Sequence, residues 1–368
     1  MVNDGITRRA VLAMMPGTLA AASKNHSRKG RPLPRVGEFV RFVDPTTETA
    51  VVRLTSPAHA SILPAPTNRF ISLKERFLIF SSDRTGKLRP FRVDLRTGIL
   101  TVLADASDLD ARSLTLDQKE QTLYFIDAGR LRVVSVAHRR EERSIASGVS
   151  AFSLGSGLRT ESELWVIREG RLEYVTGREG RLIAENVTGD CLARPGRNGC
   201  LFTRSASEGE REIWYVEADR PGSKPLMLAR GRISNPVWSA KGQSILLLRD
   251  VLRRGTYFSE IHELTPESGS EKCVAPTSQF AAFAPNEDDS VFVGASRSKA
   301  QPNILLLLRA VQREFTLCEH RASHPASVTP VFSPDSRRVY FQSDHQGKPA
   351  IYSVNVERLV EPTTAVAA

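Results

Sequence analysis

The 368-residue sequence predicts an all-β fold, a seven-bladed β-propeller closed by pairing of an N-terminal strand with the last blade. Three observations lead to this prediction. One pattern of short strands and polar turns recurs along the chain, the copies are spaced by the length of a propeller blade, and the first strand-like segment has no partner near it in the sequence.

The recurring pattern is clearest in residues 330–356, PVFSPDSRRVYFQSDHQGKPAIYSVNV. A short apolar run leads into a Ser-Pro-Asp-Ser turn, and two strands with alternating apolar and polar residues follow, separated by a second polar turn. Such alternation is typical of short antiparallel strands. Residues 80–95 repeat the design, and the SDxxG of 82–86 matches that of 343–347. We interpret Asp83 and Asp344 as turn residues that bond backbone N–H groups in their own turns.

Aligning the second strand of each unit shows the period. The aligned positions are separated by 45, 41, 36, 45, 46 and 48 residues, and they are Phe80, Phe125, Val166, Phe202, Leu247, Val293 and Phe341. Repeats of about 40–50 residues that hold several short strands are typical of a β-propeller. No unit carries a sustained helical period, so we expect seven blades around a central channel.

The last unit supplies only three strands before the chain reaches a Pro-Thr-Thr segment. The segment TAVVRLT at 49–55 precedes the first full unit and lacks a partner. We therefore expect Val51 and Leu54 to lie beside the strand at 350–356, and residues 38–44 to add a strand at the same edge. This pairing would remove the exposed edge of an open array. The propeller then covers residues 38–360, and a disordered tail follows at 361–368.

The N-terminus resembles a targeting segment. Arg8 and Arg9 precede an apolar stretch, 10–22, that ends in small residues, a pattern typical of twin-arginine export signals. It predicts a signal peptide at 1–23, a flexible leader at 24–37, and a periplasmic or secreted protein without a membrane span; a disordered basic tail is the alternative. Residues 1–43 carry +6 of the net charge of +10. Because no aromatic-interleaved basic stripe follows, we expect no nucleic-acid partner.

Four cysteines without a CxxC spacing argue against a zinc site. Cys191 and Cys200 flank the turn RPGRNG and could face each other across a hairpin. The sequence is compatible with a disulfide, which an oxidising compartment permits, and equally with two separate buried thiols.

Residues 52–55 (VRLT), the unit SSDRTG…FRVDLRTG at 81–98 and the closing unit at 330–356 resemble the oligogalacturonate lyases, a family of seven-bladed propellers. The resemblance covers roughly residues 38–356. It implies β-elimination on short pectin oligosaccharides, in which a base removes the proton alpha to a uronate carboxylate and cationic charge stabilises the enolate-like transition state. The family uses a histidine base and a manganese ion held by histidines and a glutamine at the channel mouth.

The family's metal ligands are missing at the matching positions. Aligned without a gap, its last-blade His-x-His falls on Ser327 and Thr329, and its glutamine falls on His324. The ligand histidine before the sixth-blade strand corresponds to Gln279 or Ala282. Hydroxyl groups are poor substitutes for imidazole at a transition-metal site. We therefore expect no manganese cofactor and name no metal ligand.

The catalytic stretch of the family, His-Glu-Phe-Trp, corresponds to Asn-Pro-Val-Trp at 235–238, which removes the base. Guanidinium groups bind carboxylates bidentately, so arginines at strand starts or turns are the candidates to replace the metal. The candidate catalytic residues are His324, Asn235 and Arg232, and the candidate substrate-binding residues are Arg69, Arg112, Arg194, Arg204 and Gln279. Convergence of these four arginines and Arg232 on one channel mouth would favour an acidic sugar ligand. Scatter of the five around the rim would count against it.

Two functions from different classes remain open. The protein is either a uronide lyase or binder whose ligand is an acidic oligosaccharide, or a non-catalytic propeller of the WD40 or Tol type that binds a protein or an envelope glycan. We expect a monomer in both cases.

Overall fold

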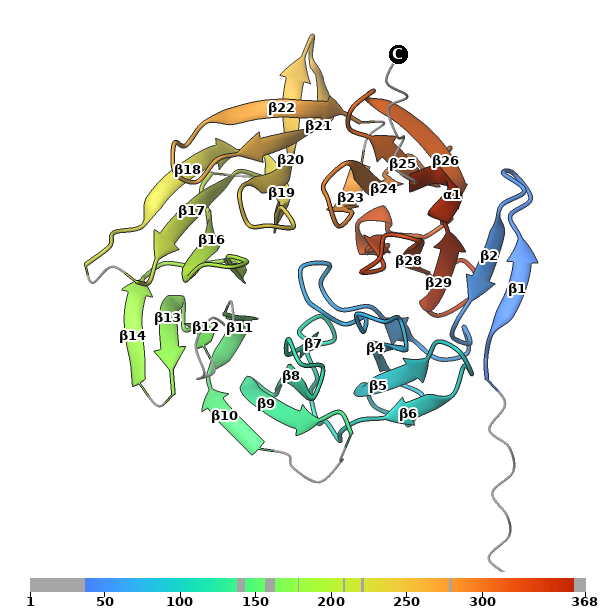
Figure 1. Cartoon of the computed structure of the whole chain (residues 1–368), viewed down its shortest axis with the longest axis horizontal. Coiled ribbons are helices and arrows are strands. Elements are labelled where there is room, and N and C mark those ends of the chain that lie inside the picture. The colour runs from blue at the N-terminus through green and yellow to red at the C-terminus, as the bar shows by residue number, and fades with distance from the viewer. Residues whose placement is uncertain are drawn as a thin grey trace, which may run out of the picture. The chain divides into compact units, whose positions relative to one another are not determined.

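The computed structural model describes residues 37–137, 143–155, 163–177, 179–207, 209–219, 222–277 and 280–360. Their strands form seven antiparallel sheets around a ring, six with four strands and one with five (Figure 1). The predicted seven-bladed β-propeller is therefore confirmed. Each sheet is one blade, and the chain passes from one blade to the next in sequence order.

The strands fall into the blades as follows. Blade 1 holds β3 (Ser61–Ile62), β4 (Phe77–Ser82), β5 (Arg89–Asp94) and β6 (Leu100–Val102). Blade 2 holds β7 (Thr115–Leu116), β8 (Thr122–Asp127), β9 (Arg130–Ser135) and β10 (Arg143–Ser147). Blade 3 holds β11 (Val149–Leu154), β12 (Glu163–Arg168), β13 (Arg171–Thr176) and β14 (Glu179–Ala184). Blade 4 holds β15 (Cys191–Ala193), β16 (Gly199–Ser205), β17 (Arg211–Glu217) and β18 (Leu226–Gly231).

Blade 5 holds β19 (Ile233–Trp238), β20 (Ile245–Arg253), β21 (Thr256–Leu264) and β22 (Glu271–Pro276). Blade 6 holds β23 (Phe280–Pro285), β24 (Val291–Ser296), β25 (Asn303–Leu308) and β26 (Arg313–Glu319). Blade 7 holds β27 (Val331–Phe332), β28 (Arg338–Ser343), β29 (Ala350–Asn355), β2 (Ala50–Arg53) and β1 (Val40–Val43). Two short helices, η1 (Pro325–Ser327) and α1 (Glu357–Val360), complete the described elements.

The seven aligned positions of the repeat occupy the second strands of the blades and are all buried. Neighbouring blades bury their apolar faces against each other. The largest apolar cluster joins blades 6, 7, 1 and 2, and smaller clusters join blades 2 to 3, 3 to 4, 4 to 5 and 5 to 6. Burial of one such side chain contributes about 1.5–3 kcal/mol, so this packing between blades is the main stabilising term.

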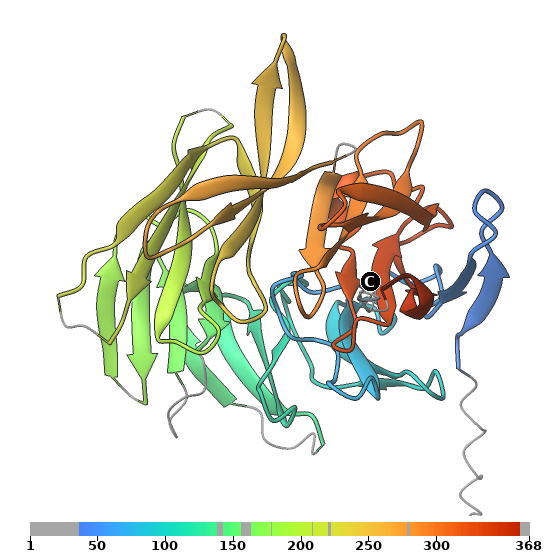
Figure 2. The same cartoon turned by 45° about the horizontal axis from the view of Figure 1, so that its top comes forward.

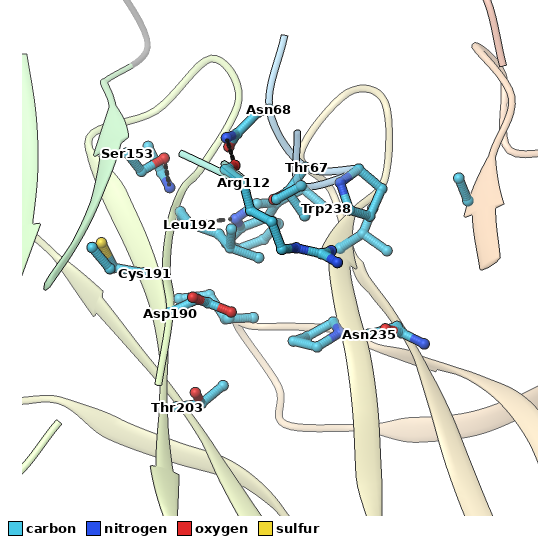
Figure 3. A pocket seen from close by; sticks show the side chains of 18 of the residues that line it. Thr67, Asn68, Arg112, Ser153, Asp190, Cys191, Leu192, Thr203, Asn235 and Trp238 are labelled. Atoms are coloured by element: carbon cyan, nitrogen blue, oxygen red, sulfur yellow. Dashed lines mark hydrogen bonds between the residues drawn. The ribbon is translucent and has the colours of Figure 1, made fainter. Parts of the chain in front are cut away.

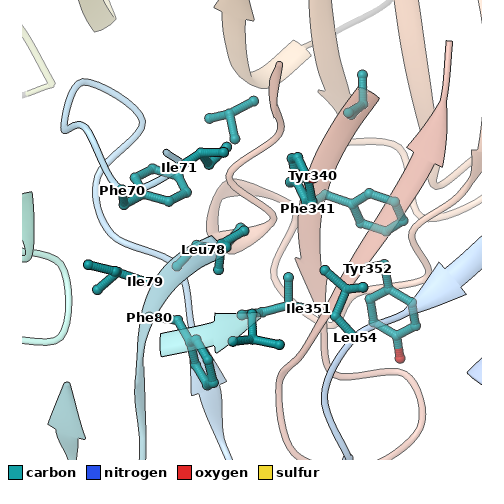
Figure 4. Packing of buried hydrophobic residues seen from close by; sticks show 14 of the residues in the cluster. Leu54, Phe70, Ile71, Leu78, Ile79, Phe80, Tyr340, Phe341, Ile351 and Tyr352 are labelled. Atoms are coloured by element: carbon teal, nitrogen blue, oxygen red, sulfur yellow. The ribbon is translucent and has the colours of Figure 1, made fainter. Parts of the chain in front are cut away.

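The ring closes as the sequence predicts. In blade 7, β2 pairs antiparallel with β29, and Val51 lies opposite Val354. The N–H of Leu54 donates to the carbonyl oxygen of Ile351 at 2.7 Å. The predicted extra strand is β1, which pairs with the outer side of β2. Figure 4 shows Leu54 beside Ile351 and Tyr352, at the junction between the first and last blades.

One turn recurs between the first and second strands of five blades and explains the Ser-Pro-Asp-Ser pattern. Its first side chain accepts hydrogen bonds from backbone N–H groups four or five residues later, as in Ser72, Asp117, Ser239, Asn286 and Ser333. Three residues after it, the backbone adopts a positive φ, at Glu75, Glu120, Gly242, Asp289 and Ser336. A capping oxygen followed by a left-handed residue thus starts the second strand in these five blades.

The interpretation of Asp83 and Asp344 as local turn residues is wrong in one respect. Their side chains bond backbone N–H groups of the loop that enters the same blade. Asp83 Oδ1 accepts from Ala60 at 2.8 Å, and Asp344 Oδ1 accepts from Ser323 at 2.8 Å. Each aspartate therefore ties the end of a second strand to the incoming chain, across about twenty residues of sequence.

The predicted signal peptide, most of the leader and the predicted tail lie outside the described residues. Among the described residues, no helix is long and apolar enough to cross a membrane. Cys191 and Cys200 are buried free thiols. Cys191 lies opposite Phe202, and Cys200 lies opposite Ala193, so the two cysteines are diagonal neighbours in the β15–β16 hairpin and not a directly facing pair.

Candidate functional site

A cavity of about 560 Å³ lies at the inner strands of the ring, and residues of all seven blades line it. Blades 3 to 7 contribute residues of their first strands. Blades 1 and 2 contribute loop residues next to their first strands. The charged residues of the described lining are Asp110, Arg112, Asp190 and Arg211, and no histidine is among them. Hydroxyl, amide and aromatic side chains make up much of the rest. This cavity, the channel cavity, is the concave site in which a ligand of a propeller is expected.

A turn of blade 1 fixes the loop that carries Arg112. The Nδ2 of Asn68 donates to the carbonyl oxygens of Arg112 at 3.0 Å and of Leu114 at 3.2 Å. The N–H of Ala65 also donates to the Arg112 carbonyl at 3.0 Å. The N–H of Arg112 donates to Asp110 Oδ1 at 3.0 Å. The backbone of Arg112 is thus held on both sides.

The side chain of Arg112, in contrast, is exposed and extends into the channel cavity (Figure 3). Its guanidinium makes no hydrogen bond and no ion pair with any residue that the structure describes. An arginine with a fixed backbone and an uncommitted guanidinium is suited to bind an anionic ligand with its planar set of donors.

Asp190 lies on blade 4, directly before β15. A Cβ on the neighbouring Gly189 would lie 2.0 Å from Thr203 Oγ1, so a larger residue here would have to displace the Thr203 side chain. The N–H of Thr203 donates to the carbonyl oxygen of Asp190 at 3.3 Å. The carboxylate of Asp190 lines the cavity and is without a partner among the described residues. Figure 3 shows Asp190, Arg112 and Asn235 around the same space.

Asn235 has a left-handed backbone, with φ at 49°, in a bulge of β19. This conformation is unusual for a residue that precedes proline, although asparagine tolerates it better than most. The Nδ2 of Asn235 donates to the carbonyl oxygen of Ala281 in blade 6 at 3.1 Å, which leaves the side-chain oxygen as an acceptor on the cavity wall. Strained residues of this kind concentrate at functional sites.

Arg194 is structural in its contacts. It is 2% exposed, and its guanidinium donates to Gly242 O at 2.7 Å, Tyr215 Oη at 2.9 Å and Glu267 Oε1 at 2.6 Å. The same guanidinium stacks 5.4 Å from the Tyr215 ring and 5.3 Å from the Trp238 ring. Burial disfavours its charge, but the bonds to Tyr215 and Glu267 outweigh burial and raise the pKa of Arg194. It therefore supports Trp238 from behind the cavity wall.

The other arginine candidates lie outside the channel cavity. Arg69 donates to the Gln118 carbonyl at 3.3 Å. Arg204 donates to the Glu185 carbonyl and lies 4.4 Å from the Trp214 ring, and Arg232 lies 4.5 Å from the Tyr257 ring. Of the five arginines, Arg112 alone lines the cavity, so they do not converge on one mouth, and this outcome counts against an acidic sugar ligand held by an arginine cluster.

The positions matched to the family's metal ligands offer a poor donor set for manganese. His324 is exposed, at the start of η1, and does not line the cavity. Ser327 is exposed, and Thr329 is 2% exposed with its hydroxyl donating to the Ser327 carbonyl at 3.2 Å. Ala282 presents a buried methyl group. Gln279 lies outside the described residues.

Comparison with known proteins supports the fold assignment. No family model matches the sequence, and no curated protein matches it. Among solved structures, an oligogalacturonate lyase in complex with manganese matches at a TM-score of 0.77 with 19% identity, covering 86% of this chain and 96% of that chain. An oligogalacturonate lyase from Vibrio parahaemolyticus matches at 0.77 with 18% identity, covering 89% and 98%. Hydrazine synthase from Kuenenia stuttgartiensis matches less well, at 0.54 with 11% identity over 78% and 95%.

These likenesses show the fold, and the resemblance to oligogalacturonate lyases drawn from the sequence is confirmed at that level. Three charged residues of the cavity, Asp110, Asp190 and Arg211, were not predicted from the sequence. The Gly-Asp pair at 189–190 was a weak signal for Asp190, because a glycine directly before the first strand of a blade leaves room for a neighbouring side chain.

Proposed function

We propose that the channel cavity binds short acidic oligosaccharides and that Arg112 pairs with a uronate carboxylate. The observation that carries this proposal is the uncommitted guanidinium of Arg112 on the cavity wall. A cationic side chain that lines a cavity and has no anionic partner of its own forms a favourable charge-assisted hydrogen bond when an anionic ligand binds. The fold that the chain shares with oligogalacturonate lyases supports the ligand class.

The other polar groups of the cavity suit the neutral part of such a ligand. The carboxylate of Asp190 and the side-chain oxygen of Asn235 accept hydrogen bonds and can receive sugar hydroxyls. The face of a sugar ring packs well on aromatic side chains, and Phe152 and Trp238 line the cavity. Arg112 would thus determine where the uronate carboxylate binds. The residues of the opposite walls would select ligands by the arrangement of their sugar hydroxyls.

The proposed binding does not involve manganese. Manganese prefers oxygen and imidazole ligands held close together, and the matched positions present hydroxyls, a methyl group and an exposed imidazole outside the cavity. No step of the proposal therefore passes through a metal ion.

Calorimetric titration with trigalacturonate tests the proposal, with a neutral galactose trimer as the control ligand. We expect trigalacturonate to bind, in the presence of chelator as well as manganese, and the neutral trimer to bind more weakly. Arg112→Gln should weaken trigalacturonate binding by about 10–100-fold, because a hydrogen bond to a charged group is worth about 1.5–3 kcal/mol. Arg232→Gln, an exposed arginine outside the cavity, is the matched control and should leave binding unchanged. Equal binding of both trimers would overturn the proposal.

β-Elimination on the bound oligosaccharide is a second candidate, favoured by the free carboxylate of Asp190. A carboxylate within reach of the proton alpha to the uronate carboxyl group can act as the base, although it is a weaker base than imidazole. Ultraviolet absorbance of the unsaturated product, followed with chelator present, tests this reaction. Product formation that Asp190→Asn abolishes would support a metal-independent lyase. Binding without product would leave a binding protein, and neither binding nor product would favour a protein partner.

We also propose export through the paired arginines Arg8 and Arg9. Fusion of residues 1–37 to a reporter that matures only after folded export tests this. We expect periplasmic reporter that disappears when both arginines are replaced by lysine. Unchanged export of the double-lysine variant would contradict a twin-arginine route.

A further inference from the structure

Blade 5 carries a second group of side chains that the channel does not use. Glu260 and His262 lie on β21, and Cys273 lies on the outer strand β22. One ligand atom of each residue, a carboxylate oxygen, an imidazole nitrogen and the thiol sulfur, lies within 4.8 Å of the other two. None of the three lines the channel cavity. β20 and β21 are the longest strands described, and their hairpin projects beyond the other blades (Figure 2).

Strand register brings the three residues to one face of the blade. Glu260 and His262 are two positions apart on β21, so their side chains point to the same side. His262 lies opposite Cys273. A bulge in β22 shifts the register by one residue, because Ile261 pairs with Ala275 and His262 with Cys273, which leaves Val274 as the extra residue. Without this bulge Cys273 would not face His262, so the extra residue assembles the group.

Further charged residues hold this group in place. The Nδ1 of His262 lies 2.8 Å from Glu271 Oε1, and its Nε2 lies 3.0 Å from Glu260 Oε2. Arg249 donates to both oxygens of Glu271, at 2.5 and 2.7 Å. Arg253 pairs with the other oxygen of Glu260. One nitrogen of the histidine therefore lies in ion-pair contact with a clamped carboxylate, and the other faces Glu260.

We propose that Glu260, His262 and Cys273 bind a divalent cation that favours thiolate and imidazole, of which Zn²⁺ is the main representative. The ligand set of sulfur, nitrogen and oxygen is one that zinc accepts. The contact between His262 Nδ1 and Glu271 matches the carboxylate that commonly orients a metal-binding histidine. Hard cations such as Mg²⁺ and Ca²⁺ prefer oxygen ligands alone and do not fit the thiol.

The burial of the three residues defines the form of the site. Glu260 is 4% exposed, the side chain of His262 is 13% exposed, and Cys273 is on the surface. Three protein ligands with one open side leave the fourth position of a tetrahedral ion to solvent or to an added ligand. On binding, the thiol of Cys273 releases its proton to solvent and becomes a thiolate, so affinity should rise with pH.

The spacing of the cysteines along the chain does not reveal this site. A CxxC arrangement places two ligands in one turn, whereas here one cysteine meets a histidine and a glutamate through strand pairing. The absence of a CxxC pair predicts no zinc site, whereas the side-chain geometry of blade 5 favours one. The experiment below distinguishes the two.

Titration of untagged, chelator-treated protein with Co²⁺ tests the proposal, because cobalt replaces zinc and reports a bound thiolate through its charge-transfer absorption. We expect this absorption in the wild type and its loss on adding Zn²⁺. Cys273→Ser should abolish it, and Glu271→Gln should weaken binding by about 10–100-fold. Lys272→Ala changes the exposed neighbour of Cys273 and is the matched control, expected to bind like the wild type. Cobalt binding without thiolate absorption, or absorption that persists in Cys273→Ser, would overturn the proposal.

Alkylation of Cys273 gives a second readout that does not depend on the folding of a variant. It is the exposed cysteine of the four, and the other three are buried. Zn²⁺ should slow its reaction with iodoacetamide in the wild type, and Mg²⁺ should not. An alkylation rate that Zn²⁺ leaves unchanged would contradict the proposal.

Discussion

Replacing Arg194 by methionine is expected to lower the free energy of unfolding by about 2–4 kcal/mol. Methionine keeps most of the aliphatic stem, so the change removes the polar contacts of the guanidinium and its stacking on the Tyr215 and Trp238 rings. Three hydrogen bonds are lost, to Gly242 O, Tyr215 Oη and Glu267 Oε1. Because the guanidinium is charged, each of these bonds is worth about 1.5–3 kcal/mol, and relief of the cost of burying the charge offsets part of their loss.

Arg197 offers a matched control on the same carboxylate. It bonds Glu267 Oε1 at 3.3 Å, but its side chain is 60% exposed, so Arg197→Met should cost less than about 1 kcal/mol. Equilibrium unfolding in urea, followed by circular dichroism, measures both variants. If Arg194→Met unfolds within 1 kcal/mol of Arg197→Met, the view of Arg194 as the buried support of Trp238 is refuted.

Three further predictions concern closure of the ring, the pH dependence of stability and the reactivity of the thiols. Val51→Asp places a carboxylate in the closing strand and should destabilise the fold strongly, whereas Val43→Asp, 59% exposed on β1, should be nearly neutral in the same urea measurement. Burial lowers the pKa of His320 below its ordinary 6.5; its Nε2 contacts Ser296 O and its Nδ1 accepts from the N–H of Ala322, so wild-type stability should fall as the pH drops below 6.5. The pH slope should be smaller in His320→Gln, and identical slopes would refute this account. Ellman's reagent should titrate one thiol of the native protein and four after denaturation, and more than one fast native thiol would contradict the burial of the others.

The fold was predictable because its signals are local and repeated. A capping oxygen such as that of Ser333, followed three residues later by the left-handed Ser336, marks the start of the second strand in five of the blades. Closure was predictable for a different reason. The strand containing Val51 had an apolar face and no partner nearby, and the last unit lacked its outer strand.

The site was less predictable because it depends on contacts between blades. Arg112 and Arg194 both precede or follow a first strand, and nothing local in the sequence tells the free guanidinium from the buried one. The difference comes from Tyr215, Gly242 and Glu267, which surround Arg194 from three other segments. The group at His262 and Cys273 depends on a one-residue bulge, whose effect on register a pattern of alternation does not reveal.

The proposed function depends on one contact, between Arg112 and a uronate carboxylate in the channel cavity. A double-mutant cycle measures this contact directly, with calorimetric binding of trigalacturonate and of its methyl ester to the wild type and to Arg112→Gln. We expect esterification to weaken binding to the wild type by about 10–100-fold and to have little effect on Arg112→Gln. Equal losses on esterification in both proteins would contradict this contact, because the carboxylate would then be recognised elsewhere or not at all.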